Sequence, residues 1–134
     1  AVPIFSNKTD KINLEQYITA RTIDELIATA KVRIADEYTS DAIVKCEITR
    51  YAKAGTIFDV NNVPQQFRLR INISLVFFDS KNQAKLWEEK DLYEETTYYE
   101  VNNLGMPAEN ETMAQNRVLD QLAKRIVSRV IYGQ

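Results

Sequence analysis

Histidine is absent from this chain and cysteine nearly so. The 134 residues contain no histidine and one cysteine, Cys46. Serine–histidine triads and cysteine–histidine dyads both need an imidazole, and most zinc sites combine histidine with cysteine. The sequence therefore excludes these classes of catalytic and metal site. We expect a protein that is not an enzyme and that has no catalytic residues, no metal site and no cofactor.

Glycine is also scarce. Only three glycines occur, and none of them belongs to a glycine-rich loop that would hold the phosphates of a nucleotide. The charge is nearly balanced, with 17 basic and 19 acidic residues. The sequence thus lacks the general basicity typical of nucleic-acid binders, and any anion site must be local.

Long hydrophobic runs are missing as well. None approaches the roughly 20 apolar residues that a membrane-spanning helix needs. The chain opens on an apolar segment at Ala1, without a methionine, so we expect upstream sequence that holds any targeting signal. Attachment to a membrane is then expected only through that upstream part. The length suits a single domain over residues 1–134 with its own hydrophobic core.

Two segments have the apolar spacing of amphipathic helices. Residues 13–30 and 113–132 repeat apolar side chains every three or four positions. The first helix is expected to begin after an N-cap at Asp10 or Asn13. A short strand is predicted after it, at residues 32–34.

Alternating apolar and polar side chains predict three further strands, at residues 42–51, 67–78 and 85–99. The polar turn at 79–84 joins the last two strands into a long antiparallel hairpin, and a loop at 101–110 leads to the closing helix. One face of the strand at 67–78 is apolar throughout, and consists of Phe67, Leu69, Ile71, Ile73, Leu75 and Phe77.

These elements predict an α+β fold. We expect a two-layer sandwich, in which two helices pack on one face of a mostly antiparallel four-stranded sheet. The first strand is expected to lie parallel to the strand after the first helix, through a right-handed crossover. This arrangement leaves the second face of the sheet without a helix.

Four cationic residues, Arg50, Lys53, Arg68 and Arg70, lie on consecutive strands that we expect to pair. If they pair, these side chains share one end of the sheet, where they could bind the phosphate groups of a lipid or another anion. The alternative is that they pair with neighbouring carboxylates or lie solvated at an edge. We take them as the candidate lipid-binding residues.

Aromatic residues gather on the last predicted strand, at Trp87, Tyr93, Tyr98 and Tyr99. Aromatic side chains on a strand commonly pack in the core or against a neighbouring strand. An exposed subset would instead suit contact with another protein. Both readings stay open, because no helix is left to cover the second face of the sheet.

The order and spacing of several short motifs resemble one family. The sequence is similar to the LptE-type lipopolysaccharide-assembly lipoproteins of Gram-negative bacteria. The motifs are VPIFSNKT at 2–9, NLE at 13–15, SDA at 40–42, ITRY at 48–51, FRL at 67–69, LWE at 86–88, LA at 122–123 and IV at 126–127.

The resemblance implies a lipid-anchored protein of the outer membrane that faces the periplasm. Its mature N-terminus would carry a lipidated cysteine, which does not occur at the start of this sequence. The family's fold is an α+β sandwich with two helices on a four-stranded sheet. The resemblance further implies a non-enzymatic role: family members plug the lumen of the LptD β-barrel, support its assembly and bind lipopolysaccharide.

A second group of envelope lipoproteins opens in a similar way. Periplasmic activators of penicillin-binding cell-wall synthases also begin with an apolar strand, a Phe-x-Asn-x-Thr segment and a helix, as at Phe5, Asn7 and Thr9 here. They would bind a synthase in place of a barrel. The long predicted hairpin over 67–99 favours the LptE-type reading, because it suits a rod-like module that must fit a lumen.

Overall fold

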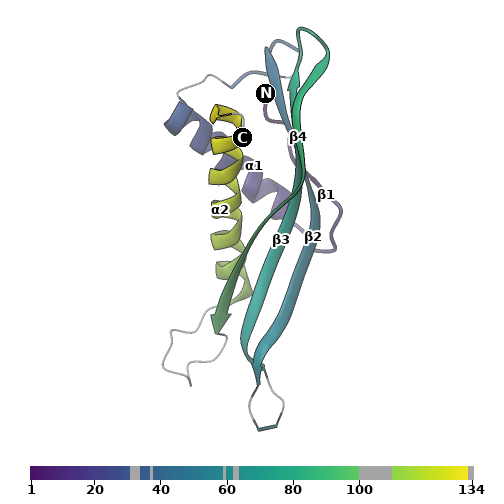
Figure 1. Cartoon of the computed structure of the whole chain (residues 1–134). Helices are drawn as coiled ribbons and strands as arrows, with labels where there is room; N and C mark the ends of the chain where they lie inside the picture. Colours follow the sequence, from purple (N-terminus) through teal and green to yellow (C-terminus); the bar gives the residue numbers. More distant parts are fainter. Residues whose placement is uncertain (31–33, 37, 59, 62–63, 100–109, 133–134) are drawn as a thin grey trace.

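The computed structural model describes residues 1–30, 34–36, 38–58, 60–61, 64–99 and 110–132. In chain order the elements are β1 (Ser6–Asn7), α1 (Leu14–Glu25), the π-helical turn η1 (Leu26–Ala30), β2 (Ala42–Phe58), β3 (Pro64–Asp79), β4 (Ala84–Tyr99) and α2 (Glu111–Tyr132). The sheet has the order β1-β2-β3-β4, with β1 parallel to β2 and the other pairs antiparallel. Figure 1 shows both helices on one face of this sheet. The predicted α+β sandwich is confirmed.

The core lies between the helices and the sheet. Strand β3 is its centre, because every second side chain of a strand points to the same face. Leu69, Ile71, Ile73 and Leu75 are all 0% exposed. From the helical layer, Ile18, Val118, Leu122 and Ile126 meet them with 0% exposure. No helix of the described residues is long and apolar enough to cross a membrane.

Several predicted boundaries differ from the observed ones. Strand geometry near the N-terminus is limited to β1, although the carbonyl of Ala1 accepts a hydrogen bond from the backbone N–H of Val44 at 2.9 Å. Asn13 precedes α1 with a φ of 69° and makes no side-chain cap hydrogen bond. Strand β2 continues past its predicted end at residue 51, because it pairs with β3 along its whole length. Most of the predicted strand at 32–34 and of the loop at 101–110 lies outside the described residues.

A β-bulge interrupts the pairing of β2 with β3. The register shifts between Ile48 and Arg50, so that one extra residue lies on β2. Before the shift, Ile48 points to the helices and is 0% exposed. After it, Tyr51 and Lys53 are opposite the buried Ile71 and Leu69 and therefore share the helix-covered face. The bulge thus decides which face of the sheet the side chains of β2 occupy up to Gly55, after which the register shifts again.

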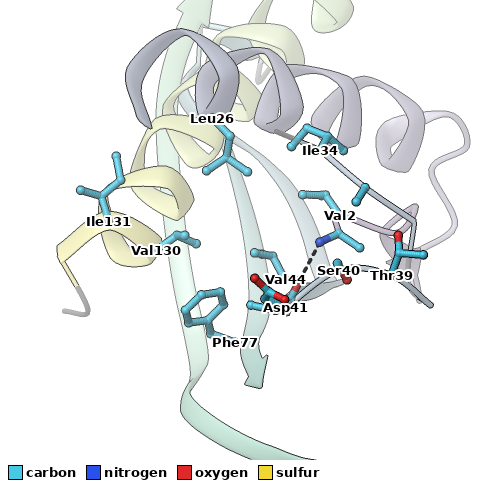
Figure 2. Close-up of a pocket in the computed structure, with 13 residues that line it drawn as sticks. Val2, Leu26, Ile34, Thr39, Ser40, Asp41, Val44, Phe77, Val130 and Ile131 are labelled. Atoms are coloured by element: carbon cyan, nitrogen blue, oxygen red, sulfur yellow. Dashed lines mark hydrogen bonds between the residues drawn. The ribbon is translucent and has the colours of Figure 1, made fainter. Parts of the chain in front are cut away.

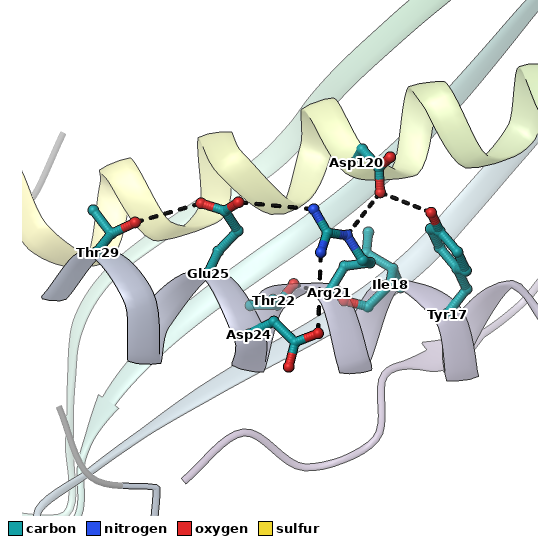
Figure 3. A network of polar contacts seen from close by, with 8 residues as sticks. All are labelled: Tyr17, Ile18, Arg21, Thr22, Asp24, Glu25, Thr29 and Asp120. Carbon is teal, nitrogen blue, oxygen red and sulfur yellow. Dashed lines mark hydrogen bonds and ion pairs between the residues drawn. The ribbon is translucent and has the colours of Figure 1, made fainter. Parts of the chain in front are cut away.

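A polar network joins the two helices on their solvent side (Figure 3). One oxygen of the Asp120 carboxylate accepts hydrogen bonds from the Tyr17 hydroxyl and from Arg21 Nε, each at 2.9 Å. Burial raises the pKa of Tyr17, and the hydrogen bond to Asp120 raises it further. Arg21 also lies 3.8 Å from the Glu25 carboxylate. The network aligns α1 with α2 and leaves their apolar sides to the sheet.

Replacing Ile71 by alanine should lower the free energy of unfolding by about 2–5 kcal/mol, because it leaves a cavity between the layers. The measurement is urea denaturation followed by circular dichroism. Ile12→Ala is the matched control, since Ile12 is 81% exposed, and its expected effect is below about 0.5 kcal/mol. Equal losses in both variants would contradict the position of Ile71 in the core.

Candidate anion-binding site

Three arginines gather on the sheet face that no helix covers. Arg50 is opposite Asn72, Ala52 is opposite Arg70 and Ala54 is opposite Arg68 in the β2–β3 register. Directly opposed residues share a face, and Arg68 and Arg70 alternate with the buried core residues of β3. Arg50, Arg68 and Arg70 therefore form one group, which we call the arginine patch.

The arginines of the patch form no ion pair among the described residues, although Glu95 on β4 is opposite Arg70. Within the described part of the chain, no carboxylate forms an ion pair with Arg50, Arg68 or Arg70. Arg50 and Arg68 are exposed, and Arg70 is half-buried. Residues two apart on a strand are separated by about 7 Å, so Arg68 and Arg70 are close enough to contact one anionic group together. The small cross-strand partners Ala52 and Ala54 leave the surface between the arginines open.

Tyr93 holds Arg70 in place from the neighbouring strand. The Arg70 Cζ atom lies 3.6 Å from the centre of the Tyr93 ring, a cation–π contact. The Arg70 Nε and Asn72 Oδ1 atoms are buried and have no hydrogen-bond partner among the described residues. Asn72 donates through its Nδ2 to the Asp91 carboxylate at 2.7 Å. The Arg70 guanidinium is thus positioned by an aromatic ring and is not committed to a carboxylate.

Lys53 lies at the same end of the sheet as the three arginines but on the other face, so it does not belong to the arginine patch. The β-bulge directs it to the helix-covered face, opposite Leu69. There its Nζ atom lies 3.1 Å from the Glu111 carboxylate and 4.3 Å from the centre of the Phe67 ring. The role of Lys53 visible in the structure is to link the sheet to the start of α2.

Glu111 is the centre of a polar cluster at the first turn of α2. Its carboxylate accepts a short hydrogen bond from the Tyr51 hydroxyl and forms ion pairs with Lys11 at 3.0 Å and Lys53 at 3.1 Å. Burial alone would raise the pKa of Glu111, but the hydrogen bonds from Tyr51, Lys11 and Lys53 outweigh it and lower the pKa to about 2. Gln115 donates to the Tyr51 hydroxyl at 2.8 Å. The cluster therefore fixes the N-terminal end of α2 to the strand that carries Arg50.

Acidification should weaken the fold through Glu111. The pKa falls from 4.5 to about 2 on folding, so the stabilisation is present above pH 4.5 and is lost as the pH falls toward 2. Because the carboxylate is partly exposed, we expect a loss of about 1–2 kcal/mol. Urea denaturation at pH 5 and at pH 2 measures it. Glu111→Gln should show a smaller difference between the two pH values; an unchanged difference would contradict this assignment.

Two of the predicted partner-interface aromatics lie on the helix-covered face. Tyr98 is 1% exposed and stacks on Phe67 at 5.6 Å between ring centres. It is a core residue, so its predicted place at a partner interface is wrong for the folded chain. Trp87 is half-buried, with its ring 5.7 Å from that of Phe77. Its visible contact is with the edge of the core.

The other two aromatics differ in exposure. Tyr99 is half-buried and its hydroxyl accepts a hydrogen bond from Gln66 Nε2 at 2.9 Å. Tyr93 is opposite Asn72 and 40% exposed. Tyr93 therefore lies on the uncovered face beside the arginine patch, where a partner or ligand can reach it.

One sheet face is packed under helices, and the other is open and carries the arginine patch. The family model described as "LptE: Lipopolysaccharide-assembly" matches residues 1–130. The chain belongs to the LptE lipopolysaccharide-assembly family, which confirms the resemblance found in the sequence. Proteins of this family are non-enzymatic assembly lipoproteins. The search of curated proteins finds no match.

Solved structures share this fold at low sequence identity. Rare lipoprotein B of Shewanella oneidensis has a TM-score of 0.58 at 9% identity, over 99% of this chain and 96% of that one. The minor lipoprotein of Acinetobacter baumannii has a TM-score of 0.54 at 15% identity, over 94% and 88%. Protein CT253 of Chlamydia trachomatis has a TM-score of 0.62 at 11% identity, over 96% and 92%. At such identities the likeness is one of fold.

Proposed function

We propose that the chain is a non-enzymatic component of the outer-membrane lipopolysaccharide translocon and binds lipopolysaccharide through the arginine patch. The observation that carries the proposal is the patch itself. Arg50, Arg68 and Arg70 gather on an open sheet face and form no ion pair among the described residues, although Glu95 is opposite Arg70 on β4. In a chain of the lipopolysaccharide-assembly family, an anionic lipid is the ligand that accounts for this arrangement.

The chemistry of the patch suits phosphate groups. A guanidinium presents several N–H donors in one plane and can bind two oxygens of a phosphate at once. Charge-assisted hydrogen bonds of this kind are about twice as strong as neutral ones. This face has no helix above it (Figure 1), so a large lipid can approach without rearrangement of the fold.

The proposal also includes a protein partner and a location. The partner is an LptD-type β-barrel of the outer membrane, which the chain would plug and help to assemble. The chain would face the periplasm and be held at the membrane by a lipid anchor upstream of Ala1. Family membership supports this part. Tyr93 supports it locally, because exposed aromatic side chains on an open face are favoured anchors at protein interfaces.

Reversing two charges of the patch should weaken lipopolysaccharide binding. For Arg68→Glu combined with Arg70→Glu we expect at least a tenfold loss of affinity, on the order of one lost charge-assisted hydrogen bond. Titration of purified lipopolysaccharide by surface plasmon resonance measures it. Both side chains lie on the uncovered face, so the thermal unfolding midpoint should change little.

The matched control, Lys81→Glu with Lys124→Glu, reverses the charge of two exposed lysines away from the patch. This variant has the same net charge as the patch variant, so it separates a local effect from general electrostatic attraction. Equal losses in both variants, or none in the folded patch variant, would remove the patch from the proposal.

Partner capture tests the assembly role. The full-length lipoprotein, tagged at its C-terminus, should recover an LptD-type barrel from detergent-solubilised outer membranes, and mass spectrometry identifies it. We expect Tyr93→Glu to reduce this recovery severalfold, because it places a charge on the open face. Tyr132→Glu is the control, since Tyr132 is 75% exposed at the end of α2. Recovery of a cell-wall synthase without the barrel would favour the activator reading.

A further inference from the structure

A cavity of about 700 Å³ opens between the helical layer and the sheet, at the end of the molecule where both helices finish. Figure 2 shows side chains from both layers around it. Leu26 and Val130 come from the helical layer, and Val44 and Phe77 come from the sheet. Ile34 closes one side. The wall is therefore an extension of the hydrophobic core that the side chains of the described residues do not fill.

The polar groups of the cavity lie on one side of it, at Thr39, Ser40 and Asp41 (Figure 2). The Asp41 side chain is 79% exposed and lies 3.4 Å from Lys81 Nζ. The Ala1 amino group also lies in the wall and donates to the Ala42 carbonyl at 2.6 Å. The charged groups at this side therefore already have partners: Asp41 pairs with Lys81, and the Ala1 amino group with a backbone carbonyl. The apolar wall, and not a charge, therefore indicates the kind of ligand.

We infer that this cavity binds one acyl chain. Size excludes a docked helix: with side chains, a helix is 10–12 Å wide and rises 5.4 Å per turn, so each turn occupies about 500 Å³. The cavity holds little more than one such turn. An alkyl chain is much thinner and can lie along the wall between the layers. Cavities of this volume with an apolar wall and a few polar groups are typical of small-ligand sites.

The inference does not depend on the arginine patch. The cavity lies on the helix-covered side of the sheet, whereas Arg68 and Arg70 lie on the uncovered face. Failure of lipopolysaccharide binding at the patch would leave the cavity unaffected, and the reverse also holds. The two sites are therefore tested separately.

The chain contains its own reporter of cavity occupancy. Trp87 is the single tryptophan, and its ring lies 5.7 Å from that of Phe77, which lines the cavity. A chain that enters beside Phe77 should change the fluorescence of Trp87. The first experiment titrates the protein with octyl, nonyl and decyl maltoside, each below its micelle concentration. Decanoate is the anionic comparison.

We expect the maltosides to bind saturably, with an affinity that rises about fourfold for each added methylene buried in the cavity. Decanoate should also bind saturably, because the apolar wall contacts its chain and Asp41 is already paired with Lys81. Absence of saturable binding, or binding that does not depend on chain length, would overturn the inference. Such a result would instead indicate that apolar side chains of a partner protein occupy the cavity.

Filling the cavity should remove binding. Ala42→Phe places a ring at a lining position, and we expect at least a tenfold loss of affinity for decyl maltoside. Ala84→Phe is the matched control, since Ala84 is exposed at the start of β4 and does not line the cavity; its affinity should be unchanged. Near-ultraviolet circular dichroism checks that each variant is folded. Equal affinities of folded Ala42→Phe and folded Ala84→Phe for decyl maltoside would overturn the inference. If Ala42→Phe does not fold, the series of maltosides of different chain length still tests the inference.

The source of the acyl chain is distinguished by displacement. Purified lipopolysaccharide and lysophosphatidylethanolamine are each added to the protein bound to decyl maltoside. Release by lipopolysaccharide alone assigns the chain to that lipid, and release by the phospholipid alone assigns it to the membrane. If neither releases the probe at saturating concentration, the cavity is not an acyl site for either natural lipid and the inference is overturned.

Discussion

The β-bulge between Ile48 and Arg50 is the constraint on which both faces of the sheet depend. A strand without it would place Arg50 among the core residues and Tyr51 on the open side, because side chains alternate strictly along a regular strand. The inserted residue reverses this assignment for β2 up to Gly55. As a result, Arg50 joins the arginines of β3, and Tyr51 reaches the first turn of α2.

The register shift at this bulge gives Arg50 and Lys53, two cations of β2, different roles. Lys53 has a carboxylate partner in Glu111 and lies over aromatic rings, so its charge is offset inside the fold. The arginines of the patch form no ion pair among the described residues, although Glu95 is opposite Arg70 on β4. Like charges at this spacing repel one another, and a bound anion would relieve that repulsion. Under the proposed function, the open face would bind the anionic ligand, whereas Lys53 on the covered face is already paired.

The sequence predicts an element well where its apolar side chains repeat with a regular helix or strand period. It predicts poorly where a feature of the tertiary structure, such as a bulge, interrupts that period. The hairpin of β3 and β4 and the closing helix lie close to their predicted bounds, because a continuous apolar face identifies each of them. A bulge has no comparable signal in a single sequence, so the sequence placed Lys53 at the correct end of the sheet but did not show which face it occupies. Tyr98 was ambiguous for a related reason: an aromatic residue fits either face of a strand, and only the register with Phe67 places it in the core. Tyr93 was predicted as a partner contact, but its stacking on Arg70 needed the β3–β4 register.

The arrangement of the two proposed sites restricts what one ligand can do. Arg70 and Phe77 are seven residues apart on β3 and on opposite faces, so about 23 Å of strand separates the patch from the cavity. A small amphiphile cannot contact both sites at once. A large lipid with several chains could reach both only by passing around an edge of the sheet. Along β4 that route is obstructed, because Arg125 of α2 donates to the carbonyl of Tyr93 at 2.8 Å and to Glu94 at 2.7 Å. The fold therefore favours occupation of the two sites by two different molecules, or by one lipid at two successive steps of its transfer.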